Sequence, residues 1–391
     1  MMVAPVTKIC ICFGIFLTLF LCLMTANYDY HTLLPNYWKY RNTNQIAVLN
    51  KVSNYRYFPT KQTPSQHIAF LKVHKTGSTT AQGIFLRYGL KRNLTFVVAN
   101  NKSTYPNVIS IEESVIPGYN IVPPPKGRRY EILCFHVVYN RSAFEGIMPN
   151  DTKYIGIVRE PFQQFKSIIR YFDYAKHNKY AQFLRQFLQN ITLSKNKENH
   201  NPATTVLNNR MAFEFNFPLH LFDSFSLHEV KQYLQKLDEE FDLVIINEYM
   251  EESVVLLRRM LNWDVQDVLF VNLNVNQGSS DLNKVGLKEV RLYRKYAALD
   301  YELYNFFLKR LWKQINSYGH DILEEISYYK LLRKNLESFC NSKETPILIV
   351  EESNWSSSFQ VTHEDCDFMR QGEFWYLNEI MKQQYSKKTV Y

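Results

Sequence analysis

The chain has 391 residues and carries 46 lysines and arginines against 37 aspartates and glutamates, a formal net charge of +9 with histidine neutral. A basic balance suits an anionic ligand or a negatively charged surface. The basic residues are scattered along the sequence rather than clustered, which argues against a nucleic-acid-binding protein.

The first segment of the chain is typical of a membrane anchor. Residues 9–26 are almost entirely apolar, and at about 1.5 Å per residue they span roughly 27 Å, close to the thickness of a secretory-pathway bilayer. Lys8 precedes the segment and the next charge is delayed to Asp29, which favours a cytoplasmic N-terminus and a lumenal remainder. A cleaved signal peptide is the alternative, but Met24 stands where a cleavage site needs a small residue. We therefore predict a cytoplasmic tail at 1–8, a transmembrane signal anchor at 9–26 and a stem at 27–66.

Glycosylation sequons fit a lumenal address for the remainder. Six N-x-[ST] motifs follow the anchor, each of which is weak evidence by itself. They begin at Asn93, Asn101, Asn140, Asn150, Asn190 and Asn354.

Apolar runs alternate with amphipathic segments from residue 67 onward. In chain order we expect a strand at Ile68–Val73, a helix from Ala81 to Tyr88, a strand at Phe96–Asn100, a proline-rich loop at Ser110–Gly127, strands at Tyr130–Tyr139 and Tyr154–Val158, helices at Phe162–Tyr171, Tyr180–Leu188 and Leu227–Phe241, a strand at Phe241–Ile246, helices at Ser253–Leu261 and Lys288–Ser317, and a further helix from Ile322 followed by an irregular serine-rich stretch. This alternation predicts an α/β fold, a three-layer, mostly parallel sheet with helices on both faces.

The loop after the first strand is the strongest candidate for a ligand site. It reads His74-Lys75-Thr76-Gly77-Ser78-Thr79-Thr80 and leads into a helix. The first N–H groups of a helix lack intrahelical partners and the helix dipole favours negative charge there, so this loop predicts an anion site to which the lysine adds charge and the hydroxyls add donors. The lysine precedes the glycine, unlike in a Walker A motif, which argues against an ordinary ATPase. The plainer interpretation is a helix cap with surface lysine and threonine.

Two further positions fit the same interpretation. Arg159 follows the strand at Tyr154–Val158, at the end where α/β folds bind ligands, and Ser167 lies about two helical turns further on. An arginine offers a bidentate fork to phosphate, although it could equally pack against Glu160. His136 ends an apolar strand, where a histidine is commonly a core residue, but its near-neutral titration suits a general base.

Four segments together resemble the galactose 3-O-sulfotransferase family. They are Phe70–Thr80, Cys134–Tyr139, Val158–Phe172 and Phe241–Asn274, and the likeness covers about His67 to Cys340. It implies a P-loop-like sulfotransferase fold, with a lumenal domain at 67–340 and a C-terminal extension at 341–391 packed on it.

The resemblance also implies the donor 3′-phosphoadenosine 5′-phosphosulfate as co-substrate, with no metal. The 5′-phosphosulfate site then falls on Lys75, Thr76, Gly77, Ser78, Thr79 and Thr80, and the 3′-phosphate site falls on Arg159 and Ser167. The catalytic residues would be His136 as base, Lys75 at the leaving group and His74, whose role stays open between positioning, acceptor contact and a share of the base.

The implied activity is transfer of a sulfuryl group to the 3-hydroxyl of a galactose on a glycolipid or glycoprotein, by a single-pass type II protein of the Golgi membrane. Three alternatives stay open. They are a uronyl 2-O-sulfotransferase acting on glycosaminoglycan, a lumenal kinase in which Glu248 would bind metal, and a catalytically inactive lectin-like module.

The cysteines divide between the anchor and the lumenal part. Cys10, Cys12 and Cys22 lie in the anchor, which leaves an odd number outside it. Cys340 and Cys366 lie outside the nucleotide-binding core, and we predict that they pair. Cys134 lies in an apolar strand and is expected to be a small buried hydrophobe.

Overall fold

The computed structural model describes residues 63–100, 105–172, 180–193, 206–272, 285–342 and 344–385. The predicted tail, the anchor at 9–26 with its cysteines, the stem up to residue 62 and the sequon at 101 lie outside these ranges. Within them, no helix is both long enough and apolar enough to cross a membrane.

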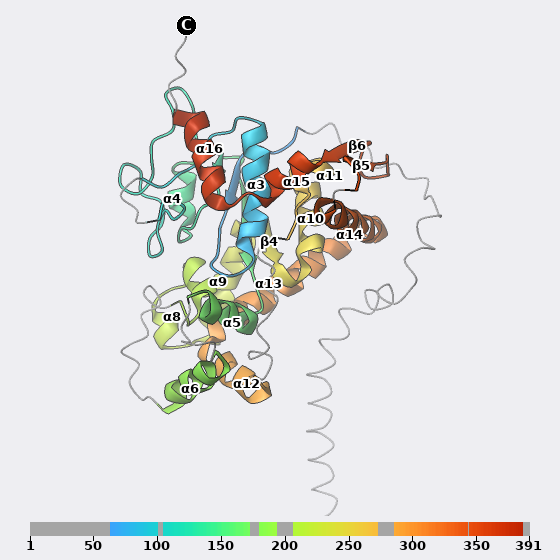
Figure 1. Ribbon diagram of the computed structural model, residues 1–391. Coiled ribbons are helices and arrows are strands. Elements are labelled where there is room, and N and C mark those ends of the chain that lie inside the picture. The colour runs from blue at the N-terminus through green and yellow to red at the C-terminus, as the bar shows by residue number, and fades with distance from the viewer. Residues whose placement is uncertain are drawn as a thin grey trace, which may run out of the picture. The chain divides into compact units, whose positions relative to one another are not determined.

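A parallel sheet lies at the centre of the described residues (Figure 1). Four strands pair in the order β2-β1-β3-β4, and every neighbouring pair is parallel. Their bounds are β1 Ile68–Phe70, β2 Ile132–Leu133, β3 Lys153–Val158 and β4 Leu243–Ile246. All strand residues except Lys153 are buried, as expected for parallel strands with both faces covered. The predicted α/β class with a parallel sheet is confirmed.

Helices surround this sheet (Figure 1). Their bounds are α3 Ser78–Lys91, α4 Arg141–Glu145, α5 Pro161–Tyr171, α6 Tyr180–Leu193, α7 Arg210–Glu214, α8 His220–Asp223, α9 Leu227–Glu240, the 3₁₀ turn η3 Asn247–Tyr249, α10 Met250–Leu261, α11 Val265–Val268, α12 Leu287–Tyr296, α13 Ala298–Ser317, α14 His320–Asn341, α15 His363–Arg370 and α16 Glu373–Tyr385. Local side-chain interactions determine where helices begin, as α5 shows. In α5, a proline occupies the first turn and the Glu160 carboxylate accepts from Gln163 N–H at 2.8 Å.

Four predicted strands differ from the observed ones by two or more residues, and the one expected at Phe241–Ile246 begins at Leu243. The strand expected at Ile68–Val73 ends at Phe70, and the one expected at Tyr130–Tyr139 keeps only Ile132–Leu133. Beyond these points the ladder is replaced partly by side chains, since the Cys134 carbonyl accepts from the Gln82 amide at 2.8 Å, and partly by loop main chain, since the His136 carbonyl accepts from Ile109 N–H at 2.9 Å. Residues 96–100 form isolated pairings rather than a strand.

The single helical region predicted at Lys288–Ser317 is two helices, α12 and α13, separated at Ala297. The Asn209 side chain accepts from Asp300 N–H at 3.1 Å, and the Asp300 carboxylate accepts from Ala212 N–H at 2.7 Å. The first turn of α13 is therefore fixed by contacts with a distant segment, which the local sequence does not reveal.

The C-terminal part is more ordered than predicted. An antiparallel hairpin, β5 Ile347–Val350 and β6 Phe359–Thr362, occupies the stretch expected to be irregular. Both α15 and α16 then pack against α3 (Figure 1). The predicted disulfide between Cys340 and Cys366 is present, with the Cα atoms 5.5 Å apart, and it ties α15 to the end of α14. Cys134 is a free, buried cysteine, as predicted.

Removal of this disulfide should cost stability. The bridge closes a loop with a sequence separation of 26 residues, and a crosslink of that span stabilises a domain by about 3 kcal/mol in the chain-entropy account. We expect the variant C340S/C366S to unfold at a lower urea concentration, with a somewhat steeper slope because the unfolded chain without the bridge exposes more surface. Wild-type protein with the bridge reduced serves as the control and should unfold with the variant. Equal midpoints for variant and oxidised wild type would contradict the prediction.

Candidate active site

The ends of three neighbouring parallel strands bring the polar segments together. His74 and Lys75 follow β1, Arg159 follows β3, and Asn247 follows β4. The carboxyl ends of parallel strands lie at one edge of the sheet, where α/β folds bind their ligands. The two anion signals found in the sequence therefore lie at the same edge.

Side chains donate to four consecutive main-chain carbonyls, those of residues 72–75, at the start of the loop. The Lys72 carbonyl accepts from His136 Nδ1 at 2.8 Å, and the Val73 carbonyl accepts from the hydroxyls of Thr76 at 3.0 Å and Ser78 at 2.6 Å. The His74 carbonyl accepts from the Gln164 amide at 2.8 Å, and the Lys75 carbonyl from Arg159 Nη1 at 3.2 Å. The entry to the loop is thus fixed by side chains from several elements.

These bonds assign different roles to the loop hydroxyls. Thr76 and Ser78 are buried and donate within the loop, so their hydroxyls shape it. Thr79 and Thr80 lie partly exposed in the first turn of α3, together with the helix N–H groups that have no intrahelical partner. Thr79, Thr80 and the first N–H groups of α3 are therefore the donors at this end of the helix that do not shape the loop.

Lys75 is constrained in both backbone and side chain. Its φ of 61° lies in the left-handed region, which is uncommon for a lysine. Its Nζ lies 3.7 Å from the ring centroid of Tyr171, a side chain of α5 that is 67% exposed. Burial, with repulsion from Arg159 and Lys72, lowers the pKa of Lys75 to about 8. A bound anion would relieve that repulsion.

Arg159 retains donors for a ligand. Among the described residues, its Nε is buried and has no hydrogen-bond partner, while Nη1 bonds the Lys75 carbonyl. Burial lowers the pKa of Arg159, although Glu248 and Glu160 oppose this. The Glu248 carboxylate itself accepts from Glu160 N–H at 3.1 Å, so it fixes the segment that carries the arginine.

Ser167 lies on the face of α5 that meets the loop. It stands three residues after Gln164 and four before Tyr171, a spacing that places all three on one face of a helix. Both neighbours contact the loop, through the His74 carbonyl and the Lys75 ammonium.

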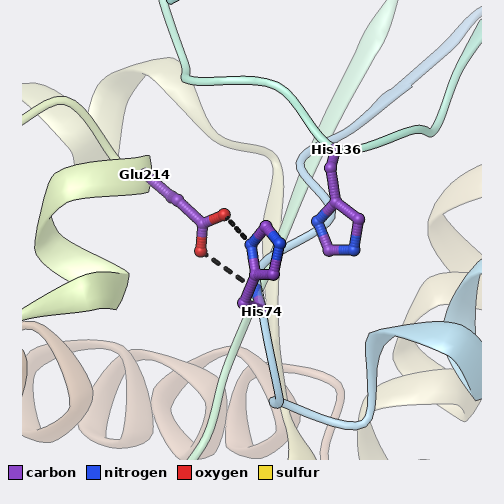
Figure 2. Close-up of side chains that lie close together, drawn as sticks. All are labelled: His74, His136 and Glu214. Atoms are coloured by element: carbon purple, nitrogen blue, oxygen red, sulfur yellow. Dashed lines mark hydrogen bonds and ion pairs between the residues drawn. The ribbon is translucent and has the colours of Figure 1, made fainter. Parts of the chain in front are cut away.

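Two histidines and a buried glutamate form a compact cluster (Figure 2). The rings of His74 and His136 stack with their centroids 3.8 Å apart. Glu214, from the end of α7, accepts from His74 Nδ1 and from His74 N–H, the latter at 2.9 Å. The carboxylate therefore fixes both the ring and the main chain of His74.

The environment sets the protonation of the cluster. Nδ1 of His136 must carry the proton because its partner, a carbonyl, only accepts, which leaves the Nε2 lone pair unprotonated. Burial, together with His74 and Lys72, lowers the pKa of His136 well below its usual value. Burial alone would raise the pKa of Glu214, but His74 and Arg210 outweigh it and lower that pKa.

The three side chains are close enough for a shared cation, since their ligand atoms lie within 4.8 Å of one another. Hydrogen bonds already engage Nδ1 of both rings, and Arg210 Nη2 lies 3.4 Å from the glutamate. As it stands, the cluster is a hydrogen-bonded acid–base array.

The sequence did not single out Glu214 or Arg210. Glu214 lies 140 residues from His74, in a five-residue helix without a motif. The sequence signal for Glu214 is a charged residue within the mainly apolar stretch Met211–Phe215, and the side chains of Glu214 and Arg210 are each 1% exposed in the structure.

The parallel sheet, the loop and the helix N-terminus are consistent with a sulfotransferase fold. The chain matches the sequence model of the galactose-3-O-sulfotransferase family over residues 6–352, so it belongs to that family, as its motifs predicted.

Three relatives that are sulfotransferases by name support the same family. The chain is 30% identical to galactose-3-O-sulfotransferase 3 of Mus musculus over 268 residues, 66% of this chain and 59% of the relative. It is 26% identical to galactosylceramide sulfotransferase of Bos taurus over 285 residues, 71% of this chain and 64% of the relative. It is 28% identical to galactose-3-O-sulfotransferase 2 of Mus musculus over 295 residues, 72% of this chain and 71% of the relative. The match thus spans about three-fifths of the first two relatives.

Gly77 should be intolerant of a side chain. Its φ is +79°, and a Cβ there would lie 2.1 Å from Asn247 Oδ1. Gly77→Ala combines a left-handed backbone cost of about 1–2 kcal/mol with this clash. We expect a larger loss of unfolding free energy, measured in urea, than for the matched control Gly118→Ala, which has φ +78° and no heavy atom within 4 Å of its Cβ. Equal losses for the two variants would show that the loop accommodates the methyl group.

Proposed function

We propose that this protein transfers a sulfuryl group from 3′-phosphoadenosine 5′-phosphosulfate to the 3-hydroxyl of a galactose on a glycolipid or glycoprotein. One observation carries the proposal: the direct bond from Arg159 to the Lys75 carbonyl joins the two anion signals at one edge of the sheet. A single nucleotide with phosphates at both ends fits such an arrangement. Family membership favours galactose over the uronyl acceptor.

We assign the site of the phosphosulfate nucleotide from the hydrogen-bond donors that the loop and Arg159 leave available. Lys75, Thr79, Thr80 and the first N–H groups of α3 would hold the 5′-phosphosulfate, with Thr76, Gly77 and Ser78 shaping the loop around it. The unpartnered Nε of Arg159 would meet the 3′-phosphate, with Ser167 beside it. This mode of binding the two phosphate groups needs no metal, because the loop and the arginine supply the positive charge.

Affinity for the product nucleotide 3′,5′-ADP should depend on the charge of Lys75. Since its pKa is about 8, the ammonium is charged at pH 7 and neutral at pH 9.5, so affinity should fall as pH rises through about 8. Calorimetry over that range measures this. The variant Lys75→Ala loses one charge-assisted contact, which is worth about 1.5–3 kcal/mol. Its affinity for 3′,5′-ADP should therefore be roughly 10- to 150-fold weaker than that of wild type at pH 7, and should not change with pH over this range.

Lys75→Arg is the matched control, because it stays charged over the whole range. If the affinity of wild type for 3′,5′-ADP stays constant from pH 7 to 9.5, Lys75 does not contribute its charge to the nucleotide site.

For the chemistry, the galactose oxygen forms a bond to sulfur, the bond from sulfur to the bridging phosphosulfate oxygen breaks, and the hydroxyl proton leaves to a base. The sequence assigned that base to His136. The structure adds a reason for His74 to take the proton, since a carboxylate bonded to Nδ1 stabilises an imidazolium, whereas burial opposes one at His136. We therefore assign proton uptake to His74 Nε2 and give His136 Nε2 the role of accepting a hydrogen bond from the acceptor. Lys75 and the loop N–H groups would meet the charge on the departing phosphate.

Glu214→Gln tests this division. The amide cannot stabilise a charged His74, so kcat should fall by about 10²- to 10⁴-fold, the usual value of a general base. Affinity for 3′,5′-ADP, measured by calorimetry, should stay within threefold of wild type. A kcat within a few-fold of wild type would return the base to His136 alone.

We also infer the cellular location and the membrane topology. The protein would be a single-pass type II protein of the Golgi membrane, with a cytoplasmic tail at 1–8, an anchor at 9–26 and a stem at 27–66. The lumenal domain at 67–340 and the extension at 341–391 would follow. The hydrophobic run at 9–26 and the six sequons support this topology.

A transfer assay with radiolabelled sulfate donor tests the activity itself. The acceptors are a panel of β-galactosides, lipid-linked and free, and the matched control is the same galactoside carrying a 3-O-methyl group. We expect label on the free 3-hydroxyl compounds and none on the methylated one. Label on both would place the transfer at another hydroxyl, and label on neither would reject the proposed acceptor class.

A further inference from the structure

Lys72 is a fully buried lysine next to the active-site loop. It lies between β1 and His74, it is 1% exposed, and its Nζ donates to Glu373 Oε1 at 2.5 Å. Burial lowers the pKa of Lys72, and the neighbouring carboxylate opposes that shift. A buried ammonium needs such a partner, because removing one member of a buried pair leaves an uncompensated charge.

Glu373 joins three elements of the site. It is the first residue of α16, and its Oε1 also accepts from the Gln82 amide of α3 at 3.0 Å. Its Oε2 accepts from the Asn107 amide at 3.0 Å. The carboxylate thus connects the lysine before the loop, the helix after the loop and the segment that pairs with His136 through Val108.

Two of the residues that Glu373 bonds, Lys72 and Gln82, also bond His136 or a residue close to it. The Lys72 carbonyl holds His136 Nδ1 at 2.8 Å, and the Gln82 amide donates to the carbonyl of Cys134, two residues before the histidine, at 2.8 Å. The ring orientation and the tautomer of His136 therefore depend on groups that the carboxylate holds in place.

We infer that Glu373, from the C-terminal extension, is a positioning residue for His136 that acts by pairing with the buried ammonium of Lys72. The family match ends at residue 352, so this residue comes from a part of the chain that the family model does not cover. The catalytic part of the inference rests on the function proposed above.

The test compares Glu373→Gln with wild type in three measurements. We expect kcat to fall at least tenfold while the Kd for 3′,5′-ADP changes less than threefold. In ¹⁵N-histidine spectra the signal of the neutral His136 with its proton on Nδ1, assigned with His136→Gln, should weaken or disappear. Glu379→Gln is the matched control, because Glu379 lies on the same helix and pairs with Lys382 at 2.7 Å; it should match wild type in all three.

A double-mutant cycle separates positioning from general destabilisation. If Glu373 acts through Lys72, then Glu373→Gln should change kcat less than twofold in a Lys72→Met background, where no ammonium is left unpaired. The same fall in both backgrounds would overturn the inference, and so would an unchanged kcat in the single variant. If that variant does not fold, a change in kcat of more than twofold between Lys72→Met and Lys72→Met/Glu373→Gln would overturn the inference.

The tautomer measurement keeps the two proposals apart. It needs no galactoside and no turnover. A wild-type protein without transfer activity would reject the proposed function, whereas an unaltered His136 signal in Glu373→Gln would reject the positioning role.

Discussion

The site depends on the hydrogen bonding of four consecutive carbonyls, from Lys72 to Lys75. A chain that leaves a sheet loses its ladder partners, and a buried carbonyl without a partner is costly. Here a histidine, two hydroxyls, an amide and a guanidinium replace the ladder. Because these donors come from the loop itself, from the segment after β2, from the end of β3 and from α5, the same bonds that stabilise the loop also assemble the candidate catalytic groups around it.

The distribution of charge follows from this crowding. Lys72 and Arg210 each have a carboxylate within bonding distance, the partly buried Glu373 and the buried Glu214 respectively. Arg159 instead lowers the pKa of Lys75 and donates to its main-chain carbonyl, and these two cations carry the positive charge that the proposed site offers to a ligand. An anion bound between them would relieve repulsion that the folded protein otherwise keeps, which increases the affinity that such a site can reach.

The sequence predicts the parts of this design that are local. A loop with Gly77 at its centre, an apolar strand before it and a helix after it can be read directly, and Arg159 after a buried strand can be read in the same way. Strand ends were predicted less well, because the length of β2 depends on where Gln82 and Val108 take over its hydrogen bonds. Glu214 and Glu373 lie 140 and 301 residues from their partners, so no local pattern marks them.

The stacking of the two histidines disfavours a second positive charge in the cluster. With ring centroids 3.8 Å apart, two imidazolium charges would repel one another strongly. Glu214 offsets that charge at His74, while Lys72 and burial oppose it at His136. The asymmetry arises from which residue lies beside each ring rather than from the rings themselves. A change in either carboxylate, Glu214 or Glu373, would therefore alter the division of roles between two chemically identical side chains.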